Sequence, residues 1–390
     1  MWSSINSIVV YGLLFGSIRM LVGAISAVYF IAVGLSISDV AYIKTFQAFI
    51  ILLADIPFSY LSDRKSKKVS ILLGALFSFL WLLFMGMGSS LFEFYLAEFF
   101  NALSLSLFNG AFIAFLINTY LNNKPEASVK NIIGMYSKYH FFLMGLAALI
   151  GSLFVSVGSR NIWIFSAITM LILLIVFSFL LPGENPRNKE RNTTPILKEL
   201  KSILIDIFSQ RDKRLYAVLL LLASLYYQII IQFWQLFINE QDRIIFEQGY
   251  IYGILFVGIL FAQSFAGYIV EKLKIEVTIK IAIIILIMML ALFSIIDKQY
   301  KIFLFIVTAF FYLRLLMLWL QSIMHEYIPS ERRATYDSIF STLGRLLLLI
   351  ALPATGYLIK IFSFQTVGII FWITIVLAFF VYIGTLANRT

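Results

Sequence analysis

The sequence predicts an all-α polytopic membrane protein, with twelve transmembrane helices in two pseudo-symmetric six-helix bundles. Of its 390 residues, 61% are hydrophobic and only 13% are charged, whereas soluble domains carry about 25% charged residues. Twelve apolar runs follow one another along the chain, each close to or above the roughly 20 residues that cross a bilayer as a helix. One polar segment divides them into six and six, which indicates two bundles of equal helix number.

These runs define the elements in order. The first six cover residues 8–33, 39–61, 69–88, 91–120, 135–157 and 162–182. In the polar segment that follows, PGENPRNKERN is typical of coil, and TTPILKELKSILIDIF predicts a short amphipathic helix on the cytoplasmic leaflet, with a partner-docking helix as the alternative. The last six runs cover residues 214–238, 248–270, 277–296, 301–325, 335–359 and 364–386. We therefore predict a bundle at 1–182, a cytoplasmic linker at 183–213 and a second bundle at 214–390.

The cationic residues predict the orientation of the chain. Twenty lysines and arginines fall in one set of predicted loops and at the C-terminus, at 62–68, 121–134, 183–214, 271–280, 326–333 and Arg389. Only five fall in the opposite loops, at Arg160, Arg243, Lys298, Lys301 and Lys360. Because positively charged loops stay in the cytoplasm, both termini are predicted to be cytoplasmic. The expected location is a bacterial inner membrane, with the chain as a multi-pass protein.

Composition also restricts the chemistry. The chain has no cysteine and two histidines, which argues against disulfides, thiolate sites and metal clusters. It contains neither a Gly-x-x-x-x-Gly-Lys-Ser/Thr loop nor a Gly-x-Ser-x-Gly element. We therefore expect no cofactor, no metal and no enzymatic activity. The expected partners are a small-molecule substrate, protons and the lipid bilayer, with no nucleic acid, and we expect a monomer.

Two internal echoes indicate a duplicated unit. Residues 59–64 match residues 267–272 at a separation of 208, and 126–151 match 331–356 at a separation of 205. Two echoes at nearly one offset indicate a duplicated six-helix unit, whose ligand site is expected near the membrane midplane between the halves.

The charged segment after the second run resembles the loop between spans 2 and 3 of the major facilitator superfamily. The usual pattern of that loop is Gly-x-x-x-Asp-Arg-x-Gly-Arg-Lys, and serines replace both glycines here. The preceding Asp55-Ile56-Pro57 resembles the lead-in of a drug-efflux-like branch. Further matches, which extend the resemblance along the chain, are Asn109-Gly110-Ala111, residues 328–335, Arg314 and Gly344-Arg345.

The resemblance implies a secondary active transporter that works by alternating access. It also implies that the loop helps to close the cytoplasmic side, because an acid at a helix end can hold a neighbouring helix or an arginine. The gating residues that it implies are Asp63 and Arg64, with Gly267, Glu271 and Lys272 as their counterparts in the second half. The alternative is that these charges serve only membrane topology.

Charged side chains inside the predicted spans are candidates for the functional site. A charge at the bilayer centre costs roughly 2.5–3.5 kcal/mol on insertion scales, so it faces a bundle interior or a water-filled cavity. For proton coupling, Asp55 is the first candidate because it lies in the family-like motif, and Glu98 is the second. A substrate cavity is predicted from polar helix faces and repeat positions, lined by Arg19, Asn109, His140, Gln228, Gln232, Arg314 and Arg345. The alternative is that these groups pair to hold helices together, as the glycine pattern of Gly12 and Gly16 is predicted to do.

The function predicted from these observations is proton-coupled export of small amphipathic molecules. Proton-coupled transport of an organic anion, a sugar or a siderophore-like solute is the alternative. An excess of midspan arginines over acids favours a substrate with an anionic group. A lipid scramblase or a membrane enzyme is a more distant alternative.

Overall fold

The chain forms an all-α structure of two compact units. The computed structural model describes residues 4–64, 66–124, 126, 129–153, 159–183, 205, 209, 211–239, 249–272, 288, 298–327, 340–362 and 366. The first unit comprises Met1–Asn188 and Arg243–Val257, and the second comprises Lys189–Asp242 and Gly258–Thr390. Most of the predicted linker at 183–213, and the runs predicted at 277–296 and 364–386 except residues 288 and 366, lie outside the described residues.

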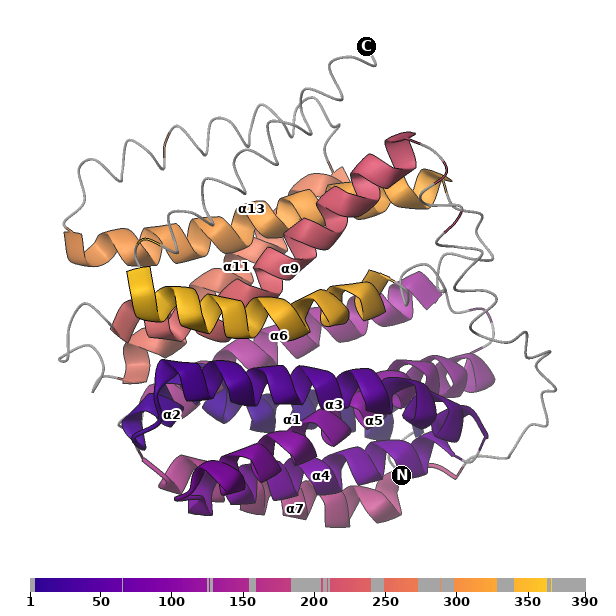
Figure 1. Cartoon of the computed structure of the whole chain (residues 1–390). Helices are drawn as coiled ribbons and strands as arrows, with labels where there is room; N and C mark the ends of the chain where they lie inside the picture. The colour runs from indigo at the N-terminus through magenta and orange to yellow at the C-terminus, as the bar shows by residue number, and fades with distance from the viewer. Residues whose placement is uncertain are drawn as a thin grey trace. The chain divides into compact units, whose positions relative to one another are not determined.

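Seven helices form most of the described first unit (Figure 1). They are α1 (Ser4–Gly23), α2 (Ser26–Ala32), α3 (Ile37–Arg64), α4 (Lys67–Met87), α5 (Leu91–Asn123), α6 (Val129–Leu153) and α7 (Asn161–Leu180). The first predicted run is therefore broken between α1 and α2, while each of the other runs of this half forms one helix over its described residues. Helix α5 packs on both α3 and α4, and α1 packs on α6 and α7.

Local sequence sets several of these helix ends. Ser90 caps α5 by accepting from the backbone N–H of Glu93, whose side chain accepts from the backbone N–H of Ser90 in return. Ser66 caps α4 by accepting from the backbone N–H of Val69 at 3.3 Å. Such side-chain caps satisfy backbone donors that have no partner within the helix.

Glycines let α1 approach its neighbours. A Cβ atom on Gly12 would meet the Phe112 ring and the Tyr136 hydroxyl, and one on Gly16 would meet the His140 ring. The prediction that these two glycines serve helix packing is confirmed. In α6, a glycine at position 151 likewise lies against the backbone of α1, so the two helices are close along much of their length.

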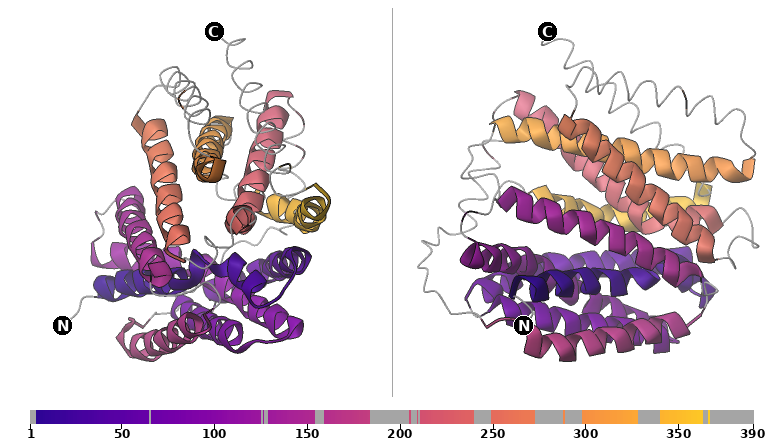
Figure 2. Two further views of the ribbon diagram at one scale, coloured as in Figure 1. Left: turned by 90° about the vertical axis from the view of Figure 1, so that its left-hand side faces the viewer. Right: turned by 180° about the vertical axis from the view of Figure 1, so that it is seen from behind.

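Four helices form most of the described second unit. They are α9 (Arg211–Asn239), α11 (Gly249–Lys272), whose part from Gly258 belongs to this unit, α13 (Lys298–Tyr327), and a helix at Phe340–Phe362. In the left view of Figure 2, α13 lies between α11 and α9. Ring contacts support this order. The ring centres of Phe311 in α13 and Phe265 in α11 are 6.1 Å apart, and those of Phe310 in α13 and Tyr227 in α9 are 5.6 Å apart.

Nine helices within the described residues are long and apolar enough to cross a membrane. Their exposed side chains include many large apolar ones, such as Phe92, Phe179, Phe261 and Ile350. An apolar exterior is what a bilayer requires, because lipid and not water surrounds it. The predicted all-α polytopic fold is confirmed.

Candidate functional site

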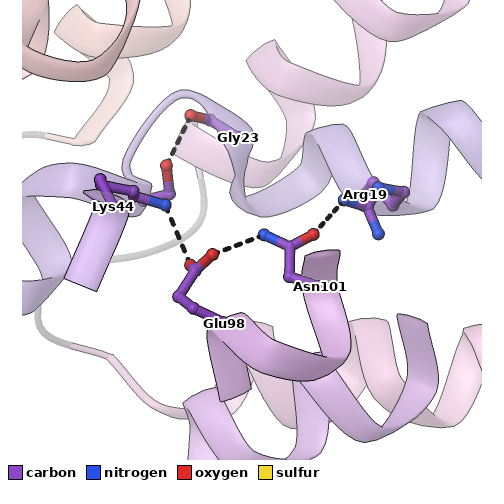
Figure 3. Close-up of polar contacts among 6 residues, drawn as sticks. Arg19, Gly23, Lys44, Glu98 and Asn101 are labelled. Atoms are coloured by element: carbon purple, nitrogen blue, oxygen red, sulfur yellow. Dashed lines mark hydrogen bonds and ion pairs between the residues drawn. The ribbon is translucent and has the colours of Figure 1, made fainter. Parts of the chain in front are cut away.

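A chain of hydrogen bonds joins three charged side chains inside the first unit (Figure 3). Lys44 Nζ lies 2.9 Å from Glu98 Oε1, and Asn101 Nδ2 donates to Glu98 Oε2 at 2.8 Å. Arg19 Nη2 donates to Asn101 Oδ1. We call these four residues, Arg19, Lys44, Glu98 and Asn101, the Glu98 network. It links α1, α3 and α5 through side chains alone.

The Glu98 network is withdrawn from the surface. Glu98 and Asn101 are 1% and 4% exposed, and Lys44 and Arg19 are 7% and 9% exposed. Glu98 and Asn101 lie three residues apart on α5, so both project from the same helix face. Lys44 reaches that face from the first half of α3, and Arg19 reaches it from the last turns of α1.

Arg19 is also held by α4. Its Nη1 donates to Ser78 Oγ of that helix at 2.8 Å, and to Ser104 Oγ of α5 at 3.4 Å. The guanidinium carbon lies 4.4 Å from the centre of the Trp81 ring and 5.6 Å from that of Phe15. Aromatic faces attract a desolvated cation, so these rings replace part of the water that the arginine has lost.

The Glu98 network carries two cations and one carboxylate. Removing one partner of a buried ion pair leaves an uncompensated charge in a medium that solvates it poorly. A proton on Glu98 Oε1 would compete with Lys44 for the same oxygen. Either a proton or the Lys44 ammonium group can therefore occupy this oxygen, and no other bond of the network has to change.

Two of the predicted site residues, Arg19 and Glu98, are thus brought together through Asn101. Lys44 was not predicted, although a lysine in the apolar run 39–61 was a visible signal. Ser78 and Ser104 gave no such signal, because serines are common in helices that pack closely.

Three other predicted residues of the first unit, Asp55, Asn109 and His140, are not among the four residues of the Glu98 network. Asp55 is half-buried in α3, two residues before Pro57, and Asn109 is exposed on α5. His140 is half-buried in α6, with its Nδ1 3.1 Å from the Tyr136 hydroxyl. The cavity assignments of Asn109 and His140 stay predictions.

A second polar cluster lies in the second unit, on three helices. The Tyr227 hydroxyl of α9 donates to Gln263 Oε1 of α11 at 2.9 Å, and its ring meets Phe310 of α13 edge to face, at 85°. Arg314 lies one helical turn after Phe310 and acts electrostatically on the Tyr227 hydroxyl. We call Tyr227, Gln263 and Arg314 the Tyr227 cluster. Of these three, only Arg314 was predicted from the sequence.

The remaining predicted cavity residues of this unit lie near the same part of α9. Gln228 is half-buried next to Tyr227, and Gln232 is half-buried one turn further along. Arg345 is half-buried and follows a glycine at 344, where a Cβ atom would lie 3.8 Å from Ser224 Oγ. The helix at Phe340–Phe362 therefore meets α9 at Ser224, one turn before Gln228.

The predicted gating residues occupy helix ends. Helix α3 ends at Arg64 and α11 ends at Lys272, and the side chains of Asp63, Arg64, Glu271 and Lys272 lie outside the described residues. Gly267 faces α13, where a Cβ atom would lie 4.0 Å from a leucine side chain. Their gating role stays a prediction.

The chain is similar to known transporters along nearly its whole length. The sequence profile of the Major Facilitator Superfamily matches residues 8–344. The crystal structure of the nucleoside transporter NupG is similar with a TM-score of 0.78 and 12% identity, over 98% of this chain and 99% of that one. A POT family transporter in complex with a thioalcohol-conjugated peptide gives a TM-score of 0.72 and 14% identity, over 99% and 96%.

A third solved structure, the inward-open xylose transporter XylE from E. coli, has a TM-score of 0.61 and 13% identity, over 96% of this chain and 94% of that one. No curated protein sequence matches significantly. These structures differ in what their names say they carry, so the drug-efflux branch stays a prediction. They share one fold, which implies twelve spans, and the profile match covers most of the sequence. The chain belongs to the major facilitator superfamily, whose members are secondary transporters that work by alternating access and not enzymes.

Proposed function

We propose that this chain is a proton-coupled transporter that exports small amphipathic molecules, with Glu98 as the side chain that binds the proton. The observation that carries the proposal is the Glu98 carboxylate, which is 1% exposed and bonded to Lys44 and Asn101. Buried carboxylates within membrane spans are expensive and mark ion and proton pathways.

The proton step follows from the geometry of this carboxylate. When Lys44 withdraws, Glu98 Oε1 loses the ammonium group that lies 2.9 Å away. A proton from water then binds this oxygen, because a neutral acid costs less than an unpaired carboxylate inside the bundle. When Lys44 returns, the proton leaves. Asn101 keeps its bond to Oε2 throughout, so the carboxyl group does not swing away.

Asp55 is the second candidate for the proton site. It is half-buried in α3 and precedes Pro57, which lies inside that helix. Proline has no N–H, so the carbonyl of Leu53 loses its helical donor and the helix is weakened there. A carboxylate beside a weakened turn can change its surroundings when the helix bends.

Orientation and gating belong to the same proposal. The distribution of lysines and arginines supports cytoplasmic termini in a bacterial inner membrane. The ends of α3 and α11, with Asp63, Arg64, Glu271 and Lys272, would then form the cytoplasmic gate.

Proton flux in liposomes tests this function. The purified chain is reconstituted, a pH gradient is imposed, and proton flux is recorded on addition of cationic, zwitterionic and anionic amphipaths. We expect flux with one charge class, lost in Glu98→Gln while that compound still binds. Asp55→Asn measures the contribution of the second carboxylate in the same assay.

Glu93→Gln is the matched control, because Glu93 lies on the same helix but caps its first turn outside the Glu98 network. It should retain flux. If labelled solutes equilibrate or follow sodium while no compound moves protons, the proton-coupling proposal is wrong. Full flux in both Glu98→Gln and Asp55→Asn would exclude these two sites.

A further inference from the structure

The Tyr227 cluster has hydrogen-bond chemistry that the proton step does not use. Its hydrogen bond fixes the Gln263 amide, since Oε1 accepts from the Tyr227 hydroxyl at 2.9 Å. The two N–H groups of Gln263 Nε2 are left without an acceptor among the described residues. The five N–H groups of Arg314 add to them. Donors therefore greatly outnumber acceptors in this cluster.

The charge of the cluster is also unbalanced. Arg314 lies near the middle of α13, which spans Lys298–Tyr327 and is apolar over most of its length. Among the described residues, no carboxylate lies within 4.0 Å of Arg314, whereas Glu98 does have an ionic partner in Lys44. An arginine at the middle of a span is costly unless something compensates its charge. An anionic ligand would do so.

Aromatic rings border the same donors. Tyr227 and Phe310 pack edge to face with their ring centres 5.6 Å apart. All three residues of the Tyr227 cluster are half-buried, whereas the Phe310 ring beside Tyr227 is fully buried. The surroundings therefore suit a ligand with an apolar body and a polar end.

We propose that the Tyr227 cluster binds the carboxylate of an amphipathic organic acid, with Arg314 and Gln263 Nε2 as donors and the Tyr227 ring against its apolar body. The guanidinium group matches a carboxylate with two parallel hydrogen bonds. This inference rests on the proposed function, since it names the substrate class of the same transporter.

Matched compounds test the charge preference directly. Calorimetry measures how the purified full chain binds indoleacetate, indoleacetamide and tryptamine, which carry a carboxylate, an amide and an amine on the same ring system. An alkyl series and a cycloalkyl series with the same three end groups are measured in parallel. We expect the acid to bind about tenfold or more tightly than the amide of the same body, and the amine to bind most weakly, because hydrogen bonds to charged groups exceed neutral ones.

Variants of the cluster separate binding from folding. Arg314→Gln should weaken acid binding roughly 10- to 100-fold and leave amide binding nearly unchanged. Gln263→Glu adds a carboxylate to the cluster that holds Arg314, so preference should shift from acid to amine. A purely structural role would not produce that reversal. Arg214→Gln is the control, because Arg214 is exposed near the start of α9.

The results distinguish this inference from the proton proposal. Acid-selective binding without proton flux would support the inference and contradict proton coupling. Equal binding of acid, amide and amine, or equal losses for all three in Arg314→Gln, would overturn the inference whatever the flux shows. Failure of every acid in the three series to bind would overturn it as well.

Discussion

The Glu98 network and the Tyr227 cluster both place arginine inside a helix bundle, but they compensate it differently. Arg19 has two serines, an asparagine and two aromatic rings around it, and a carboxylate lies one residue further along the network. Arg314 has the Tyr227 hydroxyl as its described electrostatic neighbour. The first cluster is hydrogen-bonded within the protein, whereas no described residue accepts from Gln263 Nε2 or forms an ion pair with Arg314.

This difference assigns different tasks to the two clusters. A network whose four residues are each hydrogen-bonded within the protein stabilises the bundle, and it changes only when one member is replaced, for example by a proton. A donor-rich cluster contributes little to folding and gains most when a ligand supplies the acceptors. Stability measurements should therefore respond to the first cluster, and binding measurements should respond to the second.

Breaking the ion pair should have the largest effect. Lys44→Met leaves the Glu98 carboxylate buried without its cation, and loss of one partner of a buried pair costs about 3–5 kcal/mol. The free energy of unfolding, measured in mixed micelles, checks this value. The double variant Lys44→Met/Glu98→Gln should recover much of the loss, because it removes both charges.

Lys360→Met is the control for that measurement, since Lys360 is exposed. Its effect should stay within about 0.5 kcal/mol. If Lys44→Met had an equally small effect, the ion pair would contribute little to folding, and the Glu98 network would not differ from the Tyr227 cluster in its effect on stability.

Replacing each arginine by methionine should give effects of different size. Arg19→Met removes charged hydrogen bonds to Ser78 and Asn101, each worth about 1.5–3 kcal/mol, so we expect a loss of about 3 kcal/mol. Arg314→Met removes a midspan charge without a described carboxylate, so the chain should lose less than about 1 kcal/mol or become more stable. Unfolding of both variants in the absence of ligand measures the difference. Equal losses would show that Arg314 is compensated within the protein.

The spans were predictable because hydropathy alone defines them. The run predicted at 91–120 corresponds to α5 at Leu91–Asn123, and its start is also marked by the capping pair Ser90 and Glu93. The break between α1 and α2 was not predictable, because residues 23–26 are all apolar or small. Ser26 Oγ donates to the Gly23 carbonyl at 3.3 Å and satisfies an acceptor at this break.

The polar clusters were predictable only in part. Charge inside a span identified Arg19, Glu98 and Arg314, because such residues are rare in membranes. The partners could not be identified, since helical spacing gives the face of a residue but not the helix that it meets. Tyr227 and Gln263 are 36 residues apart, and only the packing of α9 and α11 brings them together.

The smallest effects are expected from removing single hydroxyl groups, which tests whether the difference between the two clusters extends to neutral side chains. Ser104 donates to the Gly74 carbonyl at 2.7 Å and accepts from Arg19, so Ser104→Ala should cost about 1 kcal/mol. Tyr227→Phe removes only a partly buried hydroxyl, so its stability cost should be smaller than that of Ser104→Ala, while its binding of indoleacetate should fall because Gln263 is no longer oriented. Unfolding and calorimetry on the same preparations measure both quantities. Because the two variants each remove one hydroxyl group, opposite rankings in the two measurements would show that the protein uses the partners of Arg19 to fold and the Tyr227 cluster to bind.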